Sequence, residues 1–435
     1  MTKEKGVARF LLATWEGGGS VGPVLTVARK LAERGHDVRV MSDRCNRPEA
    51  EAAGATFVPW RRAPSRVDRS VESDVFRDWE VDTPDAQIGR VIDRIMTGPA
   101  LAYAEDVIEE LRREPADLVV SNEMLFGVMA GCEAIGQKFA LLTCNISLFP
   151  IAGVPPLGPG LLPPRSDEEQ AQQDEVTAAT RALFDGGLPA LNAACTALGL
   201  APIATLTDQH GAAEALLLGT SRAFDFAPAE LPSGIQYVGP QLDDPAWAAP
   251  WQSPWPSEDA RPLVLVAFST TFQDHVGVLQ RIVDGAAPLP VRLLVTLGDT
   301  IPAEALRQAQ NCRLVHSAPH NQVMAEAALV VTHGGHGTVA KALSLLKPML
   351  IVPHGRDQND NAARVTARGA GLNLTADSPA AAFQAAIERL LGEPGFAAAA
   401  RALGAQVAEE AASSPVVVTL ERMAGRECSV PARAA

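Results

Sequence analysis

The chain has 435 residues, more than a single hydrophobic core usually holds, so two domains are expected. A content of 47% hydrophobic and 20% charged residues is typical of a globular protein, and the net charge of −14 argues against nucleic acid and anionic membranes as partners. The six cysteines form no CxxC pair and no apolar run reaches the ~18 residues of a membrane span, so we expect a cytoplasmic protein without a transmembrane segment.

The first half of the chain alternates between short apolar runs and helical patterns. Residues 7–14 are a predicted strand, the glycines at 17–19 a loop, and residues 23–34 a helix that begins near Pro23 and ends at Gly35. Further strands are predicted at 37–41, 55–58, 117–121, 139–143, 215–220 and 235–238. Further helices are predicted at 49–54, 85–113 and 124–136, and residues 166–198 are helical in pattern but divided by Gly186, Gly187 and Pro189. This order predicts a Rossmann-like α/β unit whose first loop faces a ligand crevice.

Two segments interrupt this pattern. Residues 61–84 are irregular and charged, and residues 150–165 hold so many prolines and glycines that regular structure is excluded. The second segment is either a surface connector or a mobile loop that lines an apolar acceptor pocket. Large apolar side chains within 61–100 and 145–165 belong either to that pocket or to the core: Phe76, Trp79, Met96, Leu148 and Phe149.

A proline-rich stretch with three tryptophans, residues 241–262, separates the two halves, and we expect it to be packed rather than flexible. The second half begins with the apolar run 263–269, which is a predicted strand. Further strands are predicted at 292–297 and 313–315, and helices at 380–391, 395–412 and 416–424.

Residues 328–371 are the most informative stretch of the chain. They begin with a buried strand, continue with a loop of His333, Gly334 and Gly335 and a helix from about 337 to 346, and then repeat the strand, turn and helix order. A glycine-lined turn that opens into a helix presents unpaired backbone N–H groups and the positive end of the helix dipole. Such a turn is a site for phosphate.

The polar side chains beside this turn indicate a ligand with two parts. His333 at the end of its strand can donate a hydrogen bond to a phosphate oxygen, while Asp357 and Gln358 at the end of the next strand suit vicinal hydroxyls. Diphosphate at one loop and sugar hydroxyls at the next make a nucleotide-sugar site. The alternative interpretation is that the glycines only form a tight turn and that Asp357 caps the second helix.

The string His-Gly-Gly-x-Gly-Thr, followed by Pro-x-x-x-Asp-Gln-x-x-Asn-Ala, resembles the signature of the family-1 nucleotide-sugar glycosyltransferases. This family includes the bacterial antibiotic and macrolide enzymes and the UDP-glycosyltransferases. The resemblance is specific over 315–372 and extends more weakly over most of the chain. It implies the GT-B fold, in which two Rossmann-like domains with parallel sheets face each other across a cleft.

The resemblance also implies the role of each segment. It assigns the acceptor to a first domain (1–240) and the nucleotide sugar to a second (263–415), with a linker (241–262) between them and a final segment (416–435) whose helix crosses back to the first domain. The residues it places at the nucleotide sugar are Ser269, Thr270, Ala318, His333, Gly335, Gly337, Thr338, Asp357 and Gln358.

Two departures bear on the donor. Ser317 stands where the family often stacks an aromatic residue on the base, which leaves the choice between UDP and TDP open. The chain has no Asp-x-Asp pair, with which metal-dependent glycosyltransferases commonly bind a cation. We therefore expect no metal or other cofactor, and a leaving group stabilised by the helix dipole and His333.

The general base is missing from its usual position. Most family-1 enzymes have a histidine, or in some antibiotic enzymes an aspartate, where this chain has Ser20, and an aspartate where it has Asn122 and Glu123. A serine hydroxyl is no general base at neutral pH. Three interpretations remain open: another carboxylate acts, the acceptor is acidic enough to need little help, or the protein does not catalyse. The candidate carboxylates are Glu16, Glu123 and Asp274.

The expected function is that of an inverting glycosyltransferase that moves a sugar from a UDP- or TDP-sugar to a small apolar acceptor such as a natural-product aglycone. One alternative is a non-catalytic partner that binds a nucleotide sugar, and a sugar-nucleotide epimerase would share the fold. Another is a metal-dependent hydrolase whose ligands come from histidines and an aspartate near strand ends. These are His316, His320, His333, His336, His354 and Asp357. The sequence leaves the oligomeric state open.

Overall fold

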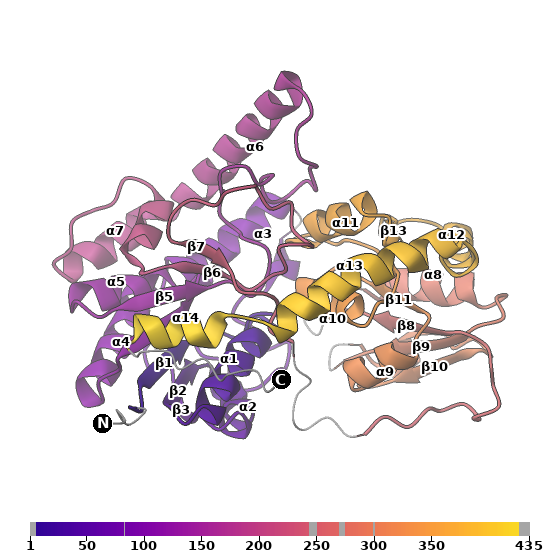
Figure 1. Cartoon of the computed structure of the whole chain (residues 1–435), viewed down its shortest axis with the longest axis horizontal. Helices are drawn as coiled ribbons and strands as arrows, with labels where there is room; N and C mark the ends of the chain where they lie inside the picture. The colour runs from indigo at the N-terminus through magenta and orange to yellow at the C-terminus, as the bar shows by residue number, and fades with distance from the viewer. Residues whose placement is uncertain (1–5, 82, 243–249, 269–274, 299–300, 426–435) are drawn as a thin grey trace, which may run out of the picture.

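The computed structural model describes residues 6–81, 83–242, 250–268, 275–298 and 301–425. Two parallel sheets lie side by side, one built from each half of the chain, and helices flank both (Figure 1). The predicted α/β architecture with two parallel sheets is confirmed.

The first sheet has seven strands in the order β3-β2-β1-β4-β5-β6-β7, and every pairing is parallel. Its strands are β1 (Arg9–Ala13), β2 (Asp37–Ser42), β3 (Thr56–Pro59), β4 (Leu118–Asn122), β5 (Phe139–Leu142), β6 (Leu216–Leu218) and β7 (Ile235–Tyr237). Its helices are α1 (Val21–Glu33), α2 (Arg47–Ala52), α3 (Pro84–Val91), α4 (Ala100–Arg113), α5 (Phe126–Ala134), α6 (Asp167–Asp185) and α7 (Leu188–Ala197).

The second sheet has six strands in the order β10-β9-β8-β11-β12-β13, again all parallel. Its strands are β8 (Leu263–Ala267), β9 (Arg292–Thr296), β10 (Cys312–Val315), β11 (Leu329–Thr332), β12 (Met349–Ile351) and β13 (Gly371–Asn373). The helices of this half are α8 (Val276–Ala286), α9 (His320–Glu326), α10 (His336–Ser344), α11 (Gln358–Ala367), α12 (Ala380–Gly392), α13 (Pro394–Ala412) and α14 (Val416–Met423).

Each sheet is buried on both faces, as apolar parallel strands require. In β8, Leu263 and Leu265 belong to one core cluster, whereas Val264 and Val266 belong to the cluster on the opposite face. The first sheet likewise separates two core clusters. Continuous runs such as Leu-Val-Leu-Val therefore form strands because both sets of side chains leave water.

The single helix predicted over residues 85–113 is wrong. The chain forms α3, then a π-helical turn, η3 (Ile92–Met96), and after a break it forms α4. Pro99 precedes α4 and lacks the N–H that a continuous helix would need. Gly98 approaches η3 so closely that a Cβ atom would lie 1.7 Å from the carbonyl oxygen of Asp93.

The last helix crosses back to the first sheet, as expected from the resemblance (Figure 1). Val416 and Leu420 of α14 are fully buried in the core cluster that includes α1. Glu421 of the same helix pairs with Arg34 and His36 at 2.9 Å each. These contacts fix α14 to the first half.

The linker tryptophans within the described residues are packed, as predicted. Trp255 is 6% exposed and lies in a core cluster of the second half. Trp251 donates its indole N–H to Glu326 of α9 at 3.0 Å. The remaining linker tryptophan, Trp247, lies outside the described residues.

The strand order brings the candidate site residues to two equivalent places. In each sheet the order reverses beside the first strand of that half, between β1 and β4 and between β8 and β11. Ligands of open parallel sheets bind at the carboxyl ends of the strands at such a switch point. None of the helices in the described part of the chain is long and apolar enough to cross a membrane.

Candidate functional site

The loop between β11 and α10 has a shape that only glycine permits. Gly334 has a φ of +95°, and a Cβ atom there would lie 2.7 Å from Cγ2 of Ile351 and 3.2 Å from the carbonyl oxygen of Gln358. A Cβ atom on Gly335 would lie 2.6 Å from Nε2 of His333. The loop is therefore pressed against both the strand below it and the neighbouring loop.

The first turn of α10 is open where the loop ends. Gly335 precedes the helix, and space remains around Gly337, since a Cβ atom there would meet nothing within 4 Å. Gly337 is exposed and Thr338 is half-buried. The structure thus brings these residues together with His333, at a helix N-terminus that suits an anion.

Asn361 joins this loop to the next one. Its side-chain amide donates to the carbonyl oxygen of Gly334 and to Oδ2 of Asp357, both at 2.9 Å. Gln358 is held as well, because its Oε1 accepts from the backbone N–H of His354 at 2.7 Å. Hydrogen bonds therefore join the loop of Gly334 to the loop that carries Asp357 and Gln358.

Asp357 does not act as a helix cap. It directly precedes α11, but its side chain makes no capping hydrogen bond to that helix. It is 9% exposed, and burial raises its pKa, while the hydrogen bond from Asn361 partly offsets this effect. Because this capping hydrogen bond is missing, the interpretation of Asp357 as a helix cap has no support.

His333 is neutral in the structure. Burial lowers its pKa to about 3, and Arg356 and His354 lower it further, while a hydrogen bond to the backbone of Ala267 acts in the opposite direction. The rings of His275 and His354 lie near it, packed around Phe268. The sequence analysis did not identify His275.

The other predicted donor residues are less well defined. Ala318 is half-buried and packs against the core of the second half, beside the exposed Ser317. Ser269, Thr270 and Asp274 lie outside the described residues.

The first switch point brings Ser20 and Asn122 together through Cys144. The Cys144 thiol donates to the carbonyl oxygen of Ser20 at 3.1 Å and accepts from the side-chain amide of Asn122 at 3.5 Å. Burial raises the pKa of the Cys144 thiol to about 12, so it stays protonated. The resemblance places a base at Ser20 and its supporting group at Asn122, yet none of these three side chains accepts a proton at neutral pH.

Glu123 follows directly in the chain but is deeply buried. It is 1% exposed, and burial raises its pKa to about 8, with a smaller lowering by the backbone N–H of Leu148. Glu123 is therefore mostly a neutral carboxylic acid at pH 7, and in that form it cannot take a proton from an acceptor.

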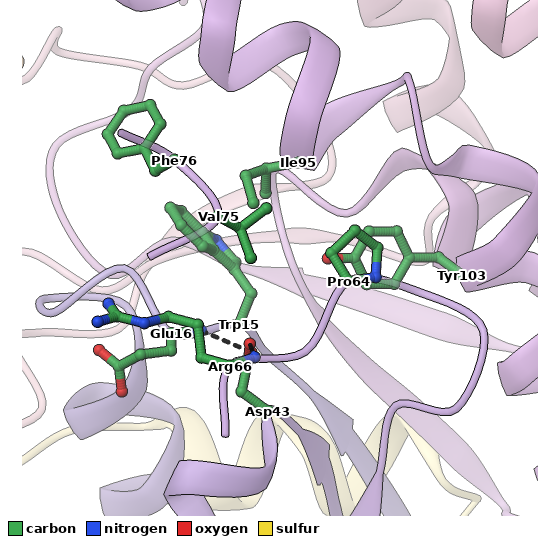
Figure 2. Close-up of a pocket in the computed structure, with 9 residues that line it drawn as sticks. All are labelled: Trp15, Glu16, Asp43, Pro64, Arg66, Val75, Phe76, Ile95 and Tyr103. Atoms are coloured by element: carbon green, nitrogen blue, oxygen red, sulfur yellow. Dashed lines mark hydrogen bonds between the residues drawn. The ribbon is translucent and has the colours of Figure 1, made fainter. Parts of the chain in front are cut away.

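Glu16 lies in the loop after β1 and is the better placed of the described carboxylates. Its Oε1 accepts from Gly18 N at 2.9 Å, and its Oε2 lies 3.5 Å from Nε of Arg69. Figure 2 shows Glu16 beside Trp15 at a cavity of about 10 Å³, room for about one water molecule.

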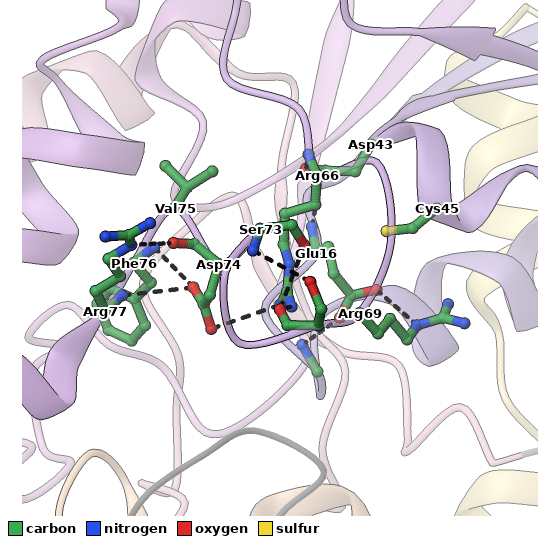
Figure 3. A network of polar contacts seen from close by, with 12 residues as sticks. Glu16, Asp43, Cys45, Arg66, Arg69, Ser73, Asp74, Val75, Phe76 and Arg77 are labelled. Atoms are coloured by element: carbon green, nitrogen blue, oxygen red, sulfur yellow. Dashed lines mark hydrogen bonds and ion pairs between the residues drawn. The ribbon is translucent and has the colours of Figure 1, made fainter. Parts of the chain in front are cut away.

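Asp43 organises the surroundings of Glu16 (Figure 3). Its carboxylate accepts from the backbone N–H groups of Glu16 at 2.8 Å and Arg66 at 2.7 Å. Burial raises the pKa of Asp43 to about 6, and the two backbone hydrogen bonds lower it. Arg66 also pairs with Asp74 at 3.6 Å. This network fixes the loops that surround the first switch point.

The large apolar side chains divide between the core and the contact with the second half. Met96 is fully buried, and Phe149 packs against Phe126 and Phe184. Phe76 instead lies under the guanidinium of Arg356, 5.0 Å from ring centroid to Cζ. The segment around Phe76 therefore contacts the loop that precedes Asp357.

The loop 150–165 is fastened to the second half. Asp360 of α11 accepts from Gly158 N at 2.8 Å and Gly160 N at 3.2 Å. Gly160 has a φ of +75°, and a Cβ atom there would lie 2.8 Å from the carbonyl oxygen of Asn359. The loop is thus more than a surface connector, because it joins the first half to the helix that follows Asp357.

No metal centre is formed by the part of the chain that the structure describes. Within those residues, no group of three or more His, Cys, Asp or Glu side chains is arranged to hold a metal ion. The ligand set proposed for a hydrolase therefore does not assemble there.

Comparisons with known proteins agree with this geometry. The model of the erythromycin biosynthesis protein CIII-like C-terminal domain matches residues 280–423. The chain is 27% identical to 4'-demethylrebeccamycin synthase of Lentzea aerocolonigenes over 428 residues, covering 94% of this chain and 97% of the relative. It is 26% identical to demethyllactenocin mycarosyltransferase of Streptomyces fradiae over 377 residues, covering 82% and 73%.

A solved structure shares the whole fold. The glycosyltransferase VinC in complex with dTDP superposes with a TM-score of 0.64 at 20% identity, covering 96% of this chain and all of that one (100%). The matches to antibiotic glycosyltransferases span both halves of the chain. These matches support the resemblance to the family-1 nucleotide-sugar glycosyltransferases and the GT-B fold, and the chain is a glycosyltransferase of the natural-product type.

Proposed function

We propose that the protein is an inverting glycosyltransferase that moves a sugar from a UDP- or TDP-sugar to an apolar acceptor such as a natural-product aglycone. The acceptor binds to residues 1–240 and the nucleotide sugar to 263–415, while 241–262 link the two and 416–435 return to the first domain. The observation that carries the proposal is the side chain of Asn361, which holds the Gly334 loop and Asp357 in one frame. The dTDP bound to VinC supports a nucleoside diphosphate as the ligand of this frame.

In this mechanism the acceptor attacks C1 of the sugar as the bond from C1 to the diphosphate oxygen breaks. Attack from the face opposite the leaving group inverts the configuration at C1. The N-terminus of α10 and His333 stabilise the negative charge that develops on the diphosphate. The proposal requires no metal and no other cofactor.

Glu16 takes the acceptor proton in this proposal. It lies at the first switch point, where its Oε2 is 3.5 Å from Nε of Arg69, and it lines the cavity beside Trp15. Glu123 holds its own proton at pH 7, since its pKa is raised to about 8. An acidic acceptor, such as a phenol, needs less help from a base than an aliphatic alcohol does.

The test is acceptor-dependent release of UDP or TDP. The protein is incubated with UDP-glucose or TDP-glucose, with and without phenolic and macrolide acceptors, and the product is identified by mass and by the NMR coupling of its anomeric proton. An inverted product is expected. Absence of UDP and TDP binding in calorimetry at millimolar ligand would refute the proposal.

The variant Glu16→Gln tests the base. We expect kcat to fall by about 100-fold with an aliphatic alcohol and by much less with a phenol, because a positioned base contributes about 100-fold or more when the acceptor is weakly acidic. Glu49→Gln is the matched control, because Glu49 also pairs with Arg69, at 2.7 Å, but does not line the cavity. Equal losses in both variants would assign Glu16 a structural role.

Ser20 favours a second candidate function. A protein that has lost the usual base could serve as a non-catalytic partner that binds a nucleotide sugar. That function predicts tight binding of UDP or TDP without turnover on any acceptor, including phenols.

A further inference from the structure

Three histidines from three loops of the second half surround one phenylalanine. The ring centroids of His275 and His354 are 4.5 Å apart, and those of His275 and His333 are 6.2 Å apart. Phe268 contacts all three rings, with centroid distances of 5.1, 6.0 and 5.7 Å to His275, His333 and His354. We call His275, His333 and His354 the histidine cluster.

The strand order explains why these residues meet. Phe268 follows β8, His333 follows β11 and His354 follows β12, and these strands are neighbours in the sheet. His275 precedes α8, the helix after β8. The histidine cluster therefore lies at the carboxyl edge of the sheet, at the second switch point, beside the loop of Gly334 and Gly335.

His275 has an unmet hydrogen-bonding capacity. It is 3% exposed, and its Nε2 has no hydrogen-bond partner among the described residues. Leaving a polar group buried without a partner is costly, so such a group in a native protein calls for an explanation. A ligand that enters the site and accepts from this nitrogen would supply one.

The charges around the histidine cluster are positive. Arg356 acts on His275 and His333, and Arg281 acts on His354. The carboxylate on the adjacent loop, Asp357, is engaged by Asn361. Asp274, next to His275 in the chain, lies outside the described residues. Burial and the nearby cations lower the pKa of all three imidazoles.

We propose that the histidine cluster binds the diphosphate of the nucleotide sugar and takes up a proton when it does so, with His275 and His354 acting together with His333. This inference rests on the proposed function and extends it from one histidine to three. Binding moves a proton from solvent to an imidazole nitrogen, and the resulting imidazolium donates a hydrogen bond to a phosphate oxygen.

The charge of the ligand is large enough to drive this uptake. At an effective dielectric constant of about 20, one elementary negative charge at ~4 Å raises the pKa of a neighbouring imidazole by about three. Burial and cations lower the pKa of His333 to about 3 and that of His275 to about 2. A diphosphate with two nearby charges therefore raises the pKa of His333 to near or above neutral pH.

Calorimetry with TDP and UDP tests the proposal on the full-length chain. Titrations at pH 7.5 in buffers of different ionisation enthalpy give the number of protons taken up, and we expect about one per bound diphosphate. Affinity should weaken as pH rises from 7 to 9, where the terminal phosphate is already ionised. Thymidine and uridine, which lack phosphate, should bind without proton uptake.

The variants His275→Phe and His275→Gln separate binding from packing. The first keeps the ring contacts and the second keeps a polar group. We expect both to weaken TDP about tenfold and to flatten its pH dependence while thymidine binding stays unchanged. His210→Phe is the matched control, because burial lowers the pKa of this histidine to about 4 in the first half. Circular dichroism shows whether each variant is folded.

Two results would overturn the inference. Wild-type protein that binds TDP without proton uptake would show that the rings stay neutral. Both His275 variants binding TDP like wild type would show that the cluster only packs. Failure of wild-type protein to bind either diphosphate would be a different outcome, because it removes the proposed donor site together with this inference.

Discussion

The two switch points of this molecule have the same topology and opposite chemical equipment. At the second, glycines, histidines and the side chain of Asn361 form a frame that suits a diphosphate and a sugar. At the first, Ser20 and Asn122 stand where the resemblance places a base and its supporting group. The Cys144 thiol bonds to the carbonyl oxygen of Ser20 and to the side-chain amide of Asn122. The second switch point therefore has the geometry that the proposed donor site needs, whereas the fold does not determine which residue takes a proton at the first.

The strongest test of this contrast is Gly334→Ala. An alanine at a φ of +95° is strained, and its Cβ atom would lie 2.7 Å from Ile351, so the loop must move. We expect no measurable binding of UDP or TDP in calorimetry and a loss of about 1–3 kcal/mol in the free energy of unfolding.

Gly392→Ala is the matched control for that experiment. Gly392 is the last residue of α12, its φ is not positive, and a Cβ atom there meets nothing within 4 Å. Denaturant unfolding should show equal or greater stability than wild type, by up to about 1 kcal/mol. If Gly334→Ala bound nucleotide as well as Gly392→Ala does, the frame would not depend on the shape of this loop.

On the acceptor side, the next largest effect is expected from Glu123→Gln. The native state holds the proton of Glu123 up to a pKa of about 8, while the unfolded chain releases it near 4.5. The native state thus binds more protons between these values, and wild-type stability falls as pH rises across that window.

Glu123→Gln removes that dependence. At pH 9 the variant should be more stable than wild type by ~5 kcal/mol in urea unfolding, and the difference should vanish near pH 4. Turnover at pH 7 should stay within about twofold, because glutamine resembles the neutral acid already present. A loss of turnover at pH 7 with the fold intact would identify Glu123 as the base after all.

A smaller effect is expected from placing at positions 20 and 122 the histidine and aspartate that most family-1 enzymes have there. In the double variant Ser20→His with Asn122→Asp, an imidazole supported by a carboxylate stands at the start of α1. We expect about a tenfold gain in kcat with aliphatic alcohols and little change with phenols, since only weakly acidic acceptors need a strong base. An equal gain with both acceptors would mean that the substitutions act on binding rather than on proton transfer.

The sequence predicted those parts of the site that are local. The strand, glycine loop and helix near His333 follow from apolar periodicity and turn chemistry within a few residues. The contacts that complete the site join distant positions: Asn361 to Gly334, and His275 to His354. No local pattern encodes these contacts, because they depend on which loops the sheet order places side by side.

The errors have the same cause. The periodicity of residues 85–113 is helical throughout, but Gly98 packs against Asp93 and Pro99 interrupts the backbone hydrogen bonds. Glu123 was a reasonable candidate base in the sequence, since its type and place suited the role. Its burial, which raises its pKa, depends on side chains from other strands and helices.

The smallest expected effect concerns the link between the two halves. Asp360 lies in α11, two residues after Gln358, and its carboxylate accepts hydrogen bonds from Gly158 and Gly160 of the loop 150–165. The helix that begins at Gln358 therefore also holds this loop. In Gly160→Ala the new Cβ atom would lie 2.8 Å from the carbonyl oxygen of Asn359, and the loop must detach. We expect the KM for the acceptor to rise about fivefold while TDP affinity stays the same.

Gly199→Ala separates detachment from backbone strain. Gly199 has a φ of +79°, close to the +75° of Gly160, but a Cβ atom there meets nothing within 4 Å. Both variants therefore carry a similar conformational cost of about 1–2 kcal/mol, and only one of them forces a contact to open. A raised acceptor KM in Gly160→Ala alone would show that the donor-side helix positions the acceptor-side loop. A raised KM in both would attribute the effect to general loss of stability, and the two switch points would then act independently.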